Sequence, residues 1–161
     1  MIRWEMDHPN LALGLVLAES VQAIPTPERL EAKIQALELG IKNAVPPVLE
    51  RTRVTIRAVL RYGGYKPSGR GKPASEYLYR LAQDEGIPRL GVLVDINNYV
   101  SLKTGYPISI LDGTLLGSDR RIRLGRPGES YVFNSSGQSM DLEGIPVVCR
   151  GETPVGNAVK D

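Results

Sequence analysis

The chain has 161 residues, 42% hydrophobic and 24% charged, which is typical of one folded domain. The net charge of +2 excludes a strong overall positive field, so any nucleic-acid contact must come from a local patch. A single cysteine excludes an internal disulfide, and with a single histidine it cannot form a structural zinc site. The longest apolar run, residues 11–18, is too short to cross a bilayer. We therefore expect a cytoplasmic protein without metal or other cofactor.

The N-terminal part of the chain predicts a strand followed by a helix. Leucine alternates with small residues over residues 11–17, a pattern typical of a buried strand. Thr26 can cap a helix whose first position is Pro27. Apolar residues then recur four, three and four positions apart from Leu30 to Ile41, so they share one helix face. We therefore expect an interior strand and an amphipathic first helix.

A second helix is predicted to begin at Pro46 and Pro47, with apolar and basic residues on opposite faces. The basic face has two interpretations, an ordinary solvated surface or a surface that contacts RNA phosphates. In the second interpretation the contacts come from Arg53, Arg57 and Arg61.

The stretch YGGYKPSGRGKP, residues 62–73, is too rich in glycine and proline to form a regular element. It combines aromatic rings with cations, the side chains that hold single-stranded nucleic acid or a tRNA end. An ordinary connecting loop is the alternative. As an RNA-binding loop it would act through Lys66, Arg70 and Lys72.

Two further helices are predicted, one from about Pro73 to Gly86 and one over residues 92–104. The first should turn Tyr77 inward together with its leucines, which favours a core residue over a surface for stacking bases. After the second helix, a Gly-Tyr-Pro turn indicates a strand over residues 108–111.

The remainder of the chain predicts short strands over residues 121–124, 130–133 and 145–150, with a hairpin turn at residues 134–138. Helices that precede antiparallel strands indicate an α+β fold of about four helices. We expect residues 1–161 to form this single domain.

The sequence lacks the residue patterns that several common enzymatic and nucleotide-binding sites require. His8 lies near the N-terminus, away from any nucleophile motif, so a Ser-His-Asp triad is not expected. Cys149 follows two valines, which favours a buried, inert thiol. The glycines of residues 62–73 lack the context of a phosphate-binding loop, so nucleotide binding is not expected either. Asp95 and Asp112 could form an acid/base pair, although strand-end capping is the simpler interpretation.

The string VDINNYVSLKTGYPISILD, residues 94–112, is the most informative segment of the chain. It resembles a segment of the editing domain, also called the B3/4 domain, in the beta subunit of bacterial phenylalanyl-tRNA synthetase. The shared pattern is Val-Asp, an Asn, Tyr-Val, a helix end at Gly, a Pro and a final Asp. Together with KPASEYLYRL, IPRL and RPGESYVF, the segment resembles free-standing relatives of this domain even more closely, over about residues 10–161.

This resemblance implies a layered α+β domain with sandwich-like antiparallel strands that removes wrongly attached tyrosine from phenylalanine tRNA. Water would attack the ester without a metal, and the partner would be the aminoacylated 3′ end of tRNA, with no DNA or membrane involved. Carried over, the catalytic positions fall on Asn98 and on Ser109, which stands where synthetase editing sites have a histidine. The positions implied around the amino acid, including a loop that closes the pocket, are Asp95, Asn97, Ser101, Gly156, Asn157 and Lys160.

Two departures from the family pattern bear on function. Serine is shorter than histidine and is not a base at neutral pH, so Ser109 argues against synthetase-type handling of the substrate. The sequence also ends at Asp161, where relatives continue into a strand whose glutamate recognises the tyrosine hydroxyl. Without that last strand, a sheet edge would be exposed and could pair with a second copy of the chain.

Three functions stay open at this point. The motif at residues 94–112 favours an editing-like domain that binds the tRNA end and hydrolyses its ester. The absent histidine and glutamate favour a non-catalytic module for an amino acid or another small ligand. A structural domain in which Asp95 and Asn98 only cap helices is the third. We also expect the arginine face and the glycine-rich loop to lie on the same side as the pocket, because phosphates must be held before the ester is presented.

Overall fold

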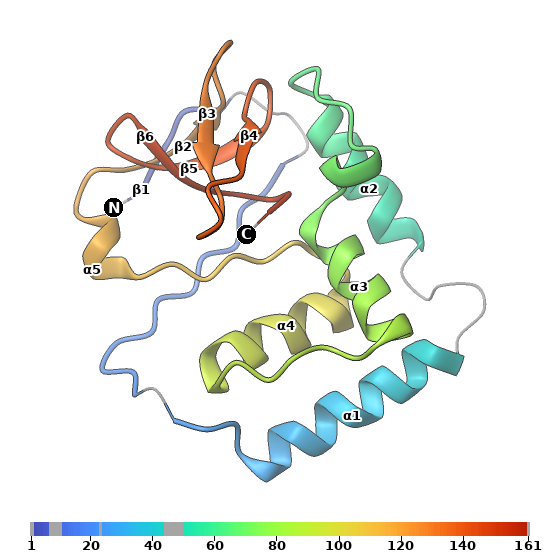
Figure 1. Cartoon of the computed structure of the whole chain (residues 1–161). Helices are drawn as coiled ribbons and strands as arrows, with labels where there is room; N and C mark the ends of the chain where they lie inside the picture. Colours follow the sequence, from blue (N-terminus) through green and yellow to red (C-terminus); the bar gives the residue numbers. More distant parts are fainter. Residues whose placement is uncertain (1, 7–10, 23, 44–49, 161) are drawn as a thin grey trace.

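A layer of helices lies beside a layer of strands in the computed structural model of the chain (Figure 1). The structure describes residues 2–6, 11–22, 24–43 and 50–160. The expectations for His8 and for a helix start at Pro46 and Pro47 fall outside these residues. The mixture of helices and sheets confirms the α+β class. In the ranges just given, none of the helices combines the length and the apolar character that a membrane crossing needs.

The helical layer consists of α1 (Glu28–Asn43), α3 (Ala74–Asp84) and α4 (Val92–Thr104), and all three lie close to their predicted positions. Their apolar stripes meet in one core cluster, in which Ile34 of α1 and Leu102 of α4 are almost completely buried. Burial of these stripes holds the three helices together, and the spacing of apolar residues was sufficient to predict it.

The helix α2 (Glu50–Arg61) stands apart from this layer (Figure 1) and carries an arginine-rich outer surface. Its buried residue, Leu60, packs against Ile145 and Val159 of the strand layer. The following residues, 62–73, form a loop with one short 3-10 turn, as their glycine and proline content predicts. This loop leads directly into α3.

The main sheet has the strand order β1-β2-β5-β6. The central strand β2 (Arg120–Leu124) pairs antiparallel with β5 (Pro146–Arg150), and β5 pairs antiparallel with β6 (Thr153–Asn157). The edge strand β1 (Ile2–Trp4) runs parallel to β2, a pairing that the sequence pattern does not predict. Cys149 on β5 is fully buried, and burial raises the pKa of its thiol, as expected for an inert core residue.

The strands β3 and β4 form a separate two-stranded sheet. It pairs β3 (Ser130–Val132) with β4 (Ser139–Asp141) through the predicted hairpin turn, in which the Phe133 amide donates to the Gln138 carbonyl at 3.0 Å. The short helix α5 (Gly113–Leu116) lies between the helical layer and the main sheet in the order of the chain.

Two predicted strands are wrong. Residues 11–17 have no regular secondary structure, and the Val16 side chain is 91% exposed. Alternation alone does not make a strand, because its backbone groups need a neighbouring edge, and no strand of the described residues pairs with this segment. Residues 108–111 return beside α4 instead, where the Asn97 amide donates to the Ile108 carbonyl at 3.0 Å in place of a strand ladder.

Candidate functional site

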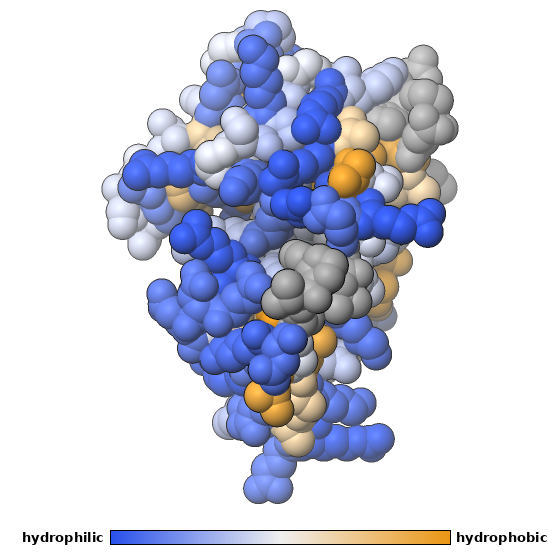
Figure 2. Space-filling view, turned by 90° about the vertical axis from the view of Figure 1, so that its right-hand side faces the viewer, coloured by the Kyte–Doolittle hydropathy of each residue, from blue (hydrophilic) through white to orange (hydrophobic). Residues whose placement is uncertain are grey.

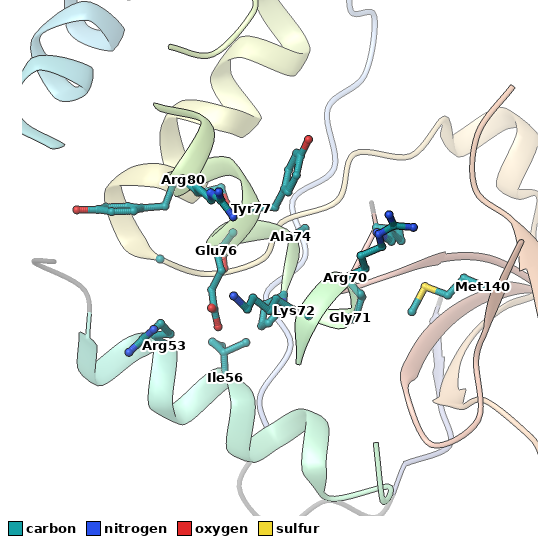
Figure 3. A pocket seen from close by; sticks show the side chains of 18 of the residues that line it. Arg53, Ile56, Arg70, Gly71, Lys72, Ala74, Glu76, Tyr77, Arg80 and Met140 are labelled. Atoms are coloured by element: carbon teal, nitrogen blue, oxygen red, sulfur yellow. The ribbon is translucent and has the colours of Figure 1, made fainter. Parts of the chain in front are cut away.

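A cleft of about 1450 Å³ lies where α2, α3 and the β3–β4 hairpin meet. Figure 3 shows Arg53 and Ile56 on the α2 wall, with Lys72 and Glu76 pointing toward them from the start of α3. Met140 on β4 faces the same space from the strand layer (Figure 3). The cleft is therefore bounded by both layers of the fold, and the end of α4 contributes to it as well.

Cationic side chains outnumber carboxylates among the described residues that line the cleft. The cations are Arg53, Arg70, Lys72, Arg80 and Lys160, and the carboxylates are Glu50, Glu76 and Asp141. Several are neutralised locally: Arg53 donates to Glu50 at 2.6 Å, and Arg80 lies 3.4 Å from Asp84. Arg70 and Lys72, by contrast, form no ion pair with any described residue. An excess of unpaired positive charge therefore sits on the glycine-rich loop.

A two-pronged ion pair ties α2 to α3 at the edge of the cleft. The Arg57 guanidinium donates to both carboxylate oxygens of Glu76 at 2.6 Å, and this interaction raises the pKa of Arg57. Only 23% of the Arg57 side chain and 12% of the Glu76 side chain are exposed. Arg57 thus serves the packing of the two helices, while Arg61 and Lys66 are exposed and do not line the cleft.

The polar residues predicted around an amino acid fasten α4 to its surroundings. Asp95 is completely buried and accepts hydrogen bonds from the Leu90 amide at 2.9 Å and from the Thr26 hydroxyl. The Thr26 side chain therefore bonds to Asp95 and has no cap bond to the helix that follows it. The Ser101 hydroxyl donates to the Tyr106 carbonyl at 2.7 Å, at a point where Ser101 also lines the cleft.

Asn98 and Ser109, the two predicted catalytic positions, occupy neighbouring stretches of chain. The hydrogen bond from Asn97 to the Ile108 carbonyl holds the segment after α4 beside the helix, which brings Ser109 to the side of α4. Asn98 precedes Ser101 by about one helical turn, and both predicted residues are partly exposed. Neither lines the cleft itself, so the cleft and the predicted catalytic positions adjoin along α4 without coinciding.

Gly156 and Asn157 are the last residues of strand β6 and not part of a loop, and the turn follows at residues 158–160. Their place around an amino acid stays a prediction. The side-chain oxygen Oδ1 of the buried Asn157 accepts hydrogen bonds from the backbone amides of Val159 at 2.8 Å and Lys160 at 3.1 Å, which folds the chain into a turn. This turn places the Lys160 ammonium over the Phe133 ring, 5.1 Å from its centre, and both side chains line the cleft.

The inward orientation predicted for Tyr77 is wrong, because 71% of this residue is exposed on the wall of the cleft. The signal was present in the sequence: Tyr77 and Arg80 are three residues apart and share a helix face, whereas Leu78 and Ala82 share the opposite, core-facing one. Tyr79 of the same helix packs against the core cluster and also lines the cleft. Its hydroxyl is buried without a partner among the described residues, and burial raises its pKa.

The outer surface on the α2 side is largely hydrophilic, and Figure 2 shows its hydrophobic areas as small and separate. Among the described residues, no group of three or more histidine, cysteine, aspartate or glutamate side chains is arranged to hold a metal ion. Cationic and aromatic side chains therefore dominate what this face and its cleft can offer to a ligand.

These features define a mixed α+β domain with an open, cation-lined cleft. The chain belongs to the B3/4 domain family, whose model matches residues 65–159, more than half of its length. The match contains residues 65–73 of the glycine-rich loop, α3, α4 and the strands β2 to β6, which include the elements that surround most of the cleft.

Three relatives are each named phenylalanine--tRNA ligase beta subunit. The protein of Streptococcus pneumoniae serotype 4 is 35% identical over 88 residues, 53% of this chain and 11% of the relative. The protein of Dechloromonas aromatica is 37% identical over 61 residues, 38% of this chain and 8% of the relative. The protein of Thermobifida fusca is 28% identical over 114 residues, 70% of this chain and 13% of the relative. The chain thus spans only about a tenth of these relatives, and no solved structure matches it.

Proposed function

We propose that this B3/4 domain binds the aminoacylated 3′ end of a tRNA. One observation carries the proposal: Arg70 and Lys72 line the cleft without an ion pair to any described residue, whereas Arg53, Arg57 and Arg80 are each paired. The phosphates of a nucleic acid are the anions such loop cations fit, because each contact releases counterions from the backbone. The names of the relatives support tRNA as the nucleic acid.

In this proposal the loop holds phosphates, and the aminoacyl group lies toward α4. Ser101 and Leu102 line the cleft, and Asn98 lies about one turn earlier on the same helix. Phosphate contacts fix the register of the strand, so the position of Arg70 and Lys72 determines how far the aminoacyl group reaches along the helix.

Hydrolysis would proceed by attack of a water oxygen on the ester carbonyl, with the ribose oxygen leaving and taking up a proton. We propose that Asn98 and Ser109 contact the ester and orient this water. Ser109 can donate and accept hydrogen bonds, but a serine hydroxyl is not a base at neutral pH. Any rate enhancement would therefore come from positioning and from hydrogen bonds to the oxygen that develops negative charge.

A second candidate function is non-catalytic binding of the aminoacyl group or of another small ligand. It is favoured by the use of the polar side chains around α4, because Asp95, Asn97 and Ser101 all hydrogen-bond within the chain. Side chains committed to internal bonds hold the scaffold in place but have little capacity left to activate water.

The deciding experiment is the loss of radiolabel from a panel of mischarged tRNAs, tyrosine on phenylalanine tRNA included, incubated with the domain. Asn98→Ala should abolish hydrolysis while leaving the melting temperature nearly unchanged. Asn43→Ala, an exposed asparagine at the end of α1, is the matched control and should leave hydrolysis intact. Binding of these tRNAs without hydrolysis would uphold tRNA binding and refute the proposed ester hydrolysis, and absence of binding would refute the proposal that the domain binds a tRNA end.

A further inference from the structure

Tyr77 is the most exposed aromatic residue that lines the cleft, with 71% of its surface accessible. Packing does not account for it. The helix α3 is fixed to the helical layer through other residues, among them Leu78, Leu81 and Ala82, and Tyr77 is not part of that core cluster. A large ring left in solvent on the wall of a cleft is therefore available for a ligand.

The side chains around Tyr77 are cationic. Arg80 stands one turn further along the same face of α3, and Lys72 and Arg70 precede the helix (Figure 3). In Figure 3, Tyr77 and Arg80 stand on α3 above Lys72, so ring and cations follow one another along one wall. Arg80 lies near Asp84, whereas Arg70 and Lys72 lack a carboxylate partner among the described residues.

An exposed ring beside unpaired cations is the arrangement that binds single-stranded nucleic acids. The cations follow the phosphates, and the ring offers its face to a base, which is tolerant of sequence because every base has a π-face. Paired RNA would not fit this mode, since its bases are already stacked on each other and their faces are covered. The wall formed by Arg70, Lys72, Tyr77 and Arg80 thus distinguishes an unpaired RNA end from a duplex.

We propose that Tyr77 is a binding residue that stacks on a base of the unpaired 3′ end of the tRNA, with the adjoining phosphates at Arg70 and Lys72. This inference rests on the proposed function and deepens it, because it assigns the base-binding surface and the single-stranded character of the RNA. Neither depends on whether the ester is hydrolysed.

The test measures binding of a short, fluorescently labelled single-stranded RNA ending in CCA to the whole domain by anisotropy. Tyr77→Ala should weaken binding at least about fivefold, while Tyr77→Phe should stay within about twofold because the ring is kept. Tyr106→Ala is the matched control, since Tyr106 is 54% exposed but does not line the cleft, and it should leave binding unchanged. Because Tyr77 is exposed, all three variants should keep the wild-type melting temperature.

A second probe carries an abasic site in place of the stacked base. The wild type should bind it more weakly by the factor lost in Tyr77→Ala, and the variant should show no further loss. The stacking assignment would be overturned if Tyr77→Ala and wild type bound the intact RNA with equal affinity, or if Tyr106→Ala lost as much affinity as Tyr77→Ala. In either case, salt-sensitive binding of RNA by the wild type would still uphold the proposed function. Wild-type protein that binds no RNA at all would overturn both.

Discussion

Two cation-rich regions of this chain differ in what surrounds their charges. Around β2, Arg123 is held by both carboxylate oxygens of Glu129 at 2.7 and 2.8 Å, and Arg126 lies 2.5 Å from Glu152. In the loop of residues 62–73, the cations have no such carboxylate among the described residues. A basic run therefore indicates nucleic-acid binding only after the carboxylates that pair with it have been located.

The same contrast separates stability from binding. A buried charge pair stabilises a fold only while it is complete, because either partner left alone keeps its desolvation cost. An unpaired, exposed cation contributes little to stability and retains its full attraction for a phosphate. We therefore expect substitutions around β2 to change the free energy of unfolding, and substitutions in the loop to change RNA binding.

The largest expected effect is that of Arg123→Met. Only 5% of Arg123 is exposed, and its loss leaves Glu129 without the partner that compensates its burial. We expect the free energy of unfolding to fall by about 3–5 kcal/mol, measured by urea denaturation. Arg70→Met is the matched control and should remain within about 0.5 kcal/mol of wild type. Similar values for the two variants would abolish the contrast between the regions.

The same ion pair predicts how stability depends on pH. Hydrogen bonds from Arg123 lower the pKa of Glu129 from 4.5 to about 2, and the amide of Arg126 adds to the effect. Since the folded-state pKa is depressed, the stabilisation is complete above about pH 4.5 and is lost as the pH falls toward 2. The contribution to the free energy of unfolding that is lost over this pH range is about 3 kcal/mol. Glu129→Gln should remove this part of the acid dependence, and an unchanged pH profile of urea unfolding would contradict the assignment.

A smaller loss of stability is expected for Asp95→Ala. Compared with Asn98→Ala, it distinguishes residues that anchor α4 from residues proposed to bind a ligand. Asp95→Ala would leave the Leu90 amide and the Thr26 hydroxyl without their acceptor in a buried site. We expect a loss of about 2 kcal/mol in urea unfolding. Asn98→Ala, three residues further on and partly exposed, should cost less than about 0.5 kcal/mol. Equal losses would mean that Asn98 also serves only to hold the helix.

Much of the helical layer could be predicted from sequence because its signals are local. The 3.6-residue spacing and the Gly105 stop determine α4 from Val92 to Thr104, and the apolar stripe of α1 meets a core formed by nearby helices. The strand expected over residues 11–17 is wrong for the opposite reason, since a strand depends on an edge provided by residues far away in the chain. The parallel partner of β1 is likewise more than a hundred residues distant.

The cleft brings together only some of the cations singled out from sequence, since Arg53 lines it with Arg70 and Lys72 but Arg57 and Arg61 do not. That the arginine face and the glycine-rich loop lie on the side of an amino-acid pocket stays a prediction. Sequence could not show that Arg57 is bound by Glu76, because that pair depends on how two helices meet. Tyr77 is exposed although tyrosine is often a core residue, because helical spacing puts it on the same face of α3 as Arg80.

The smallest effect on stability is expected for loop variants, which test directly whether the unpaired cations bind RNA. Arg70→Gln and Lys72→Gln should each leave unfolding within about 0.5 kcal/mol of wild type. Each should reduce the salt dependence of RNA affinity by about one unit in the slope of log affinity against log salt, because one phosphate contact fewer releases one counterion fewer. In the double variant, this slope should fall by about two units.

Arg126→Gln is the control, because the charge of Arg126 is held by Glu152, and it should leave the slope of log affinity against log salt unchanged. An equal reduction for Arg126→Gln would mean that RNA follows net charge, whereas a reduction confined to the loop would mean that it follows the unpaired cations.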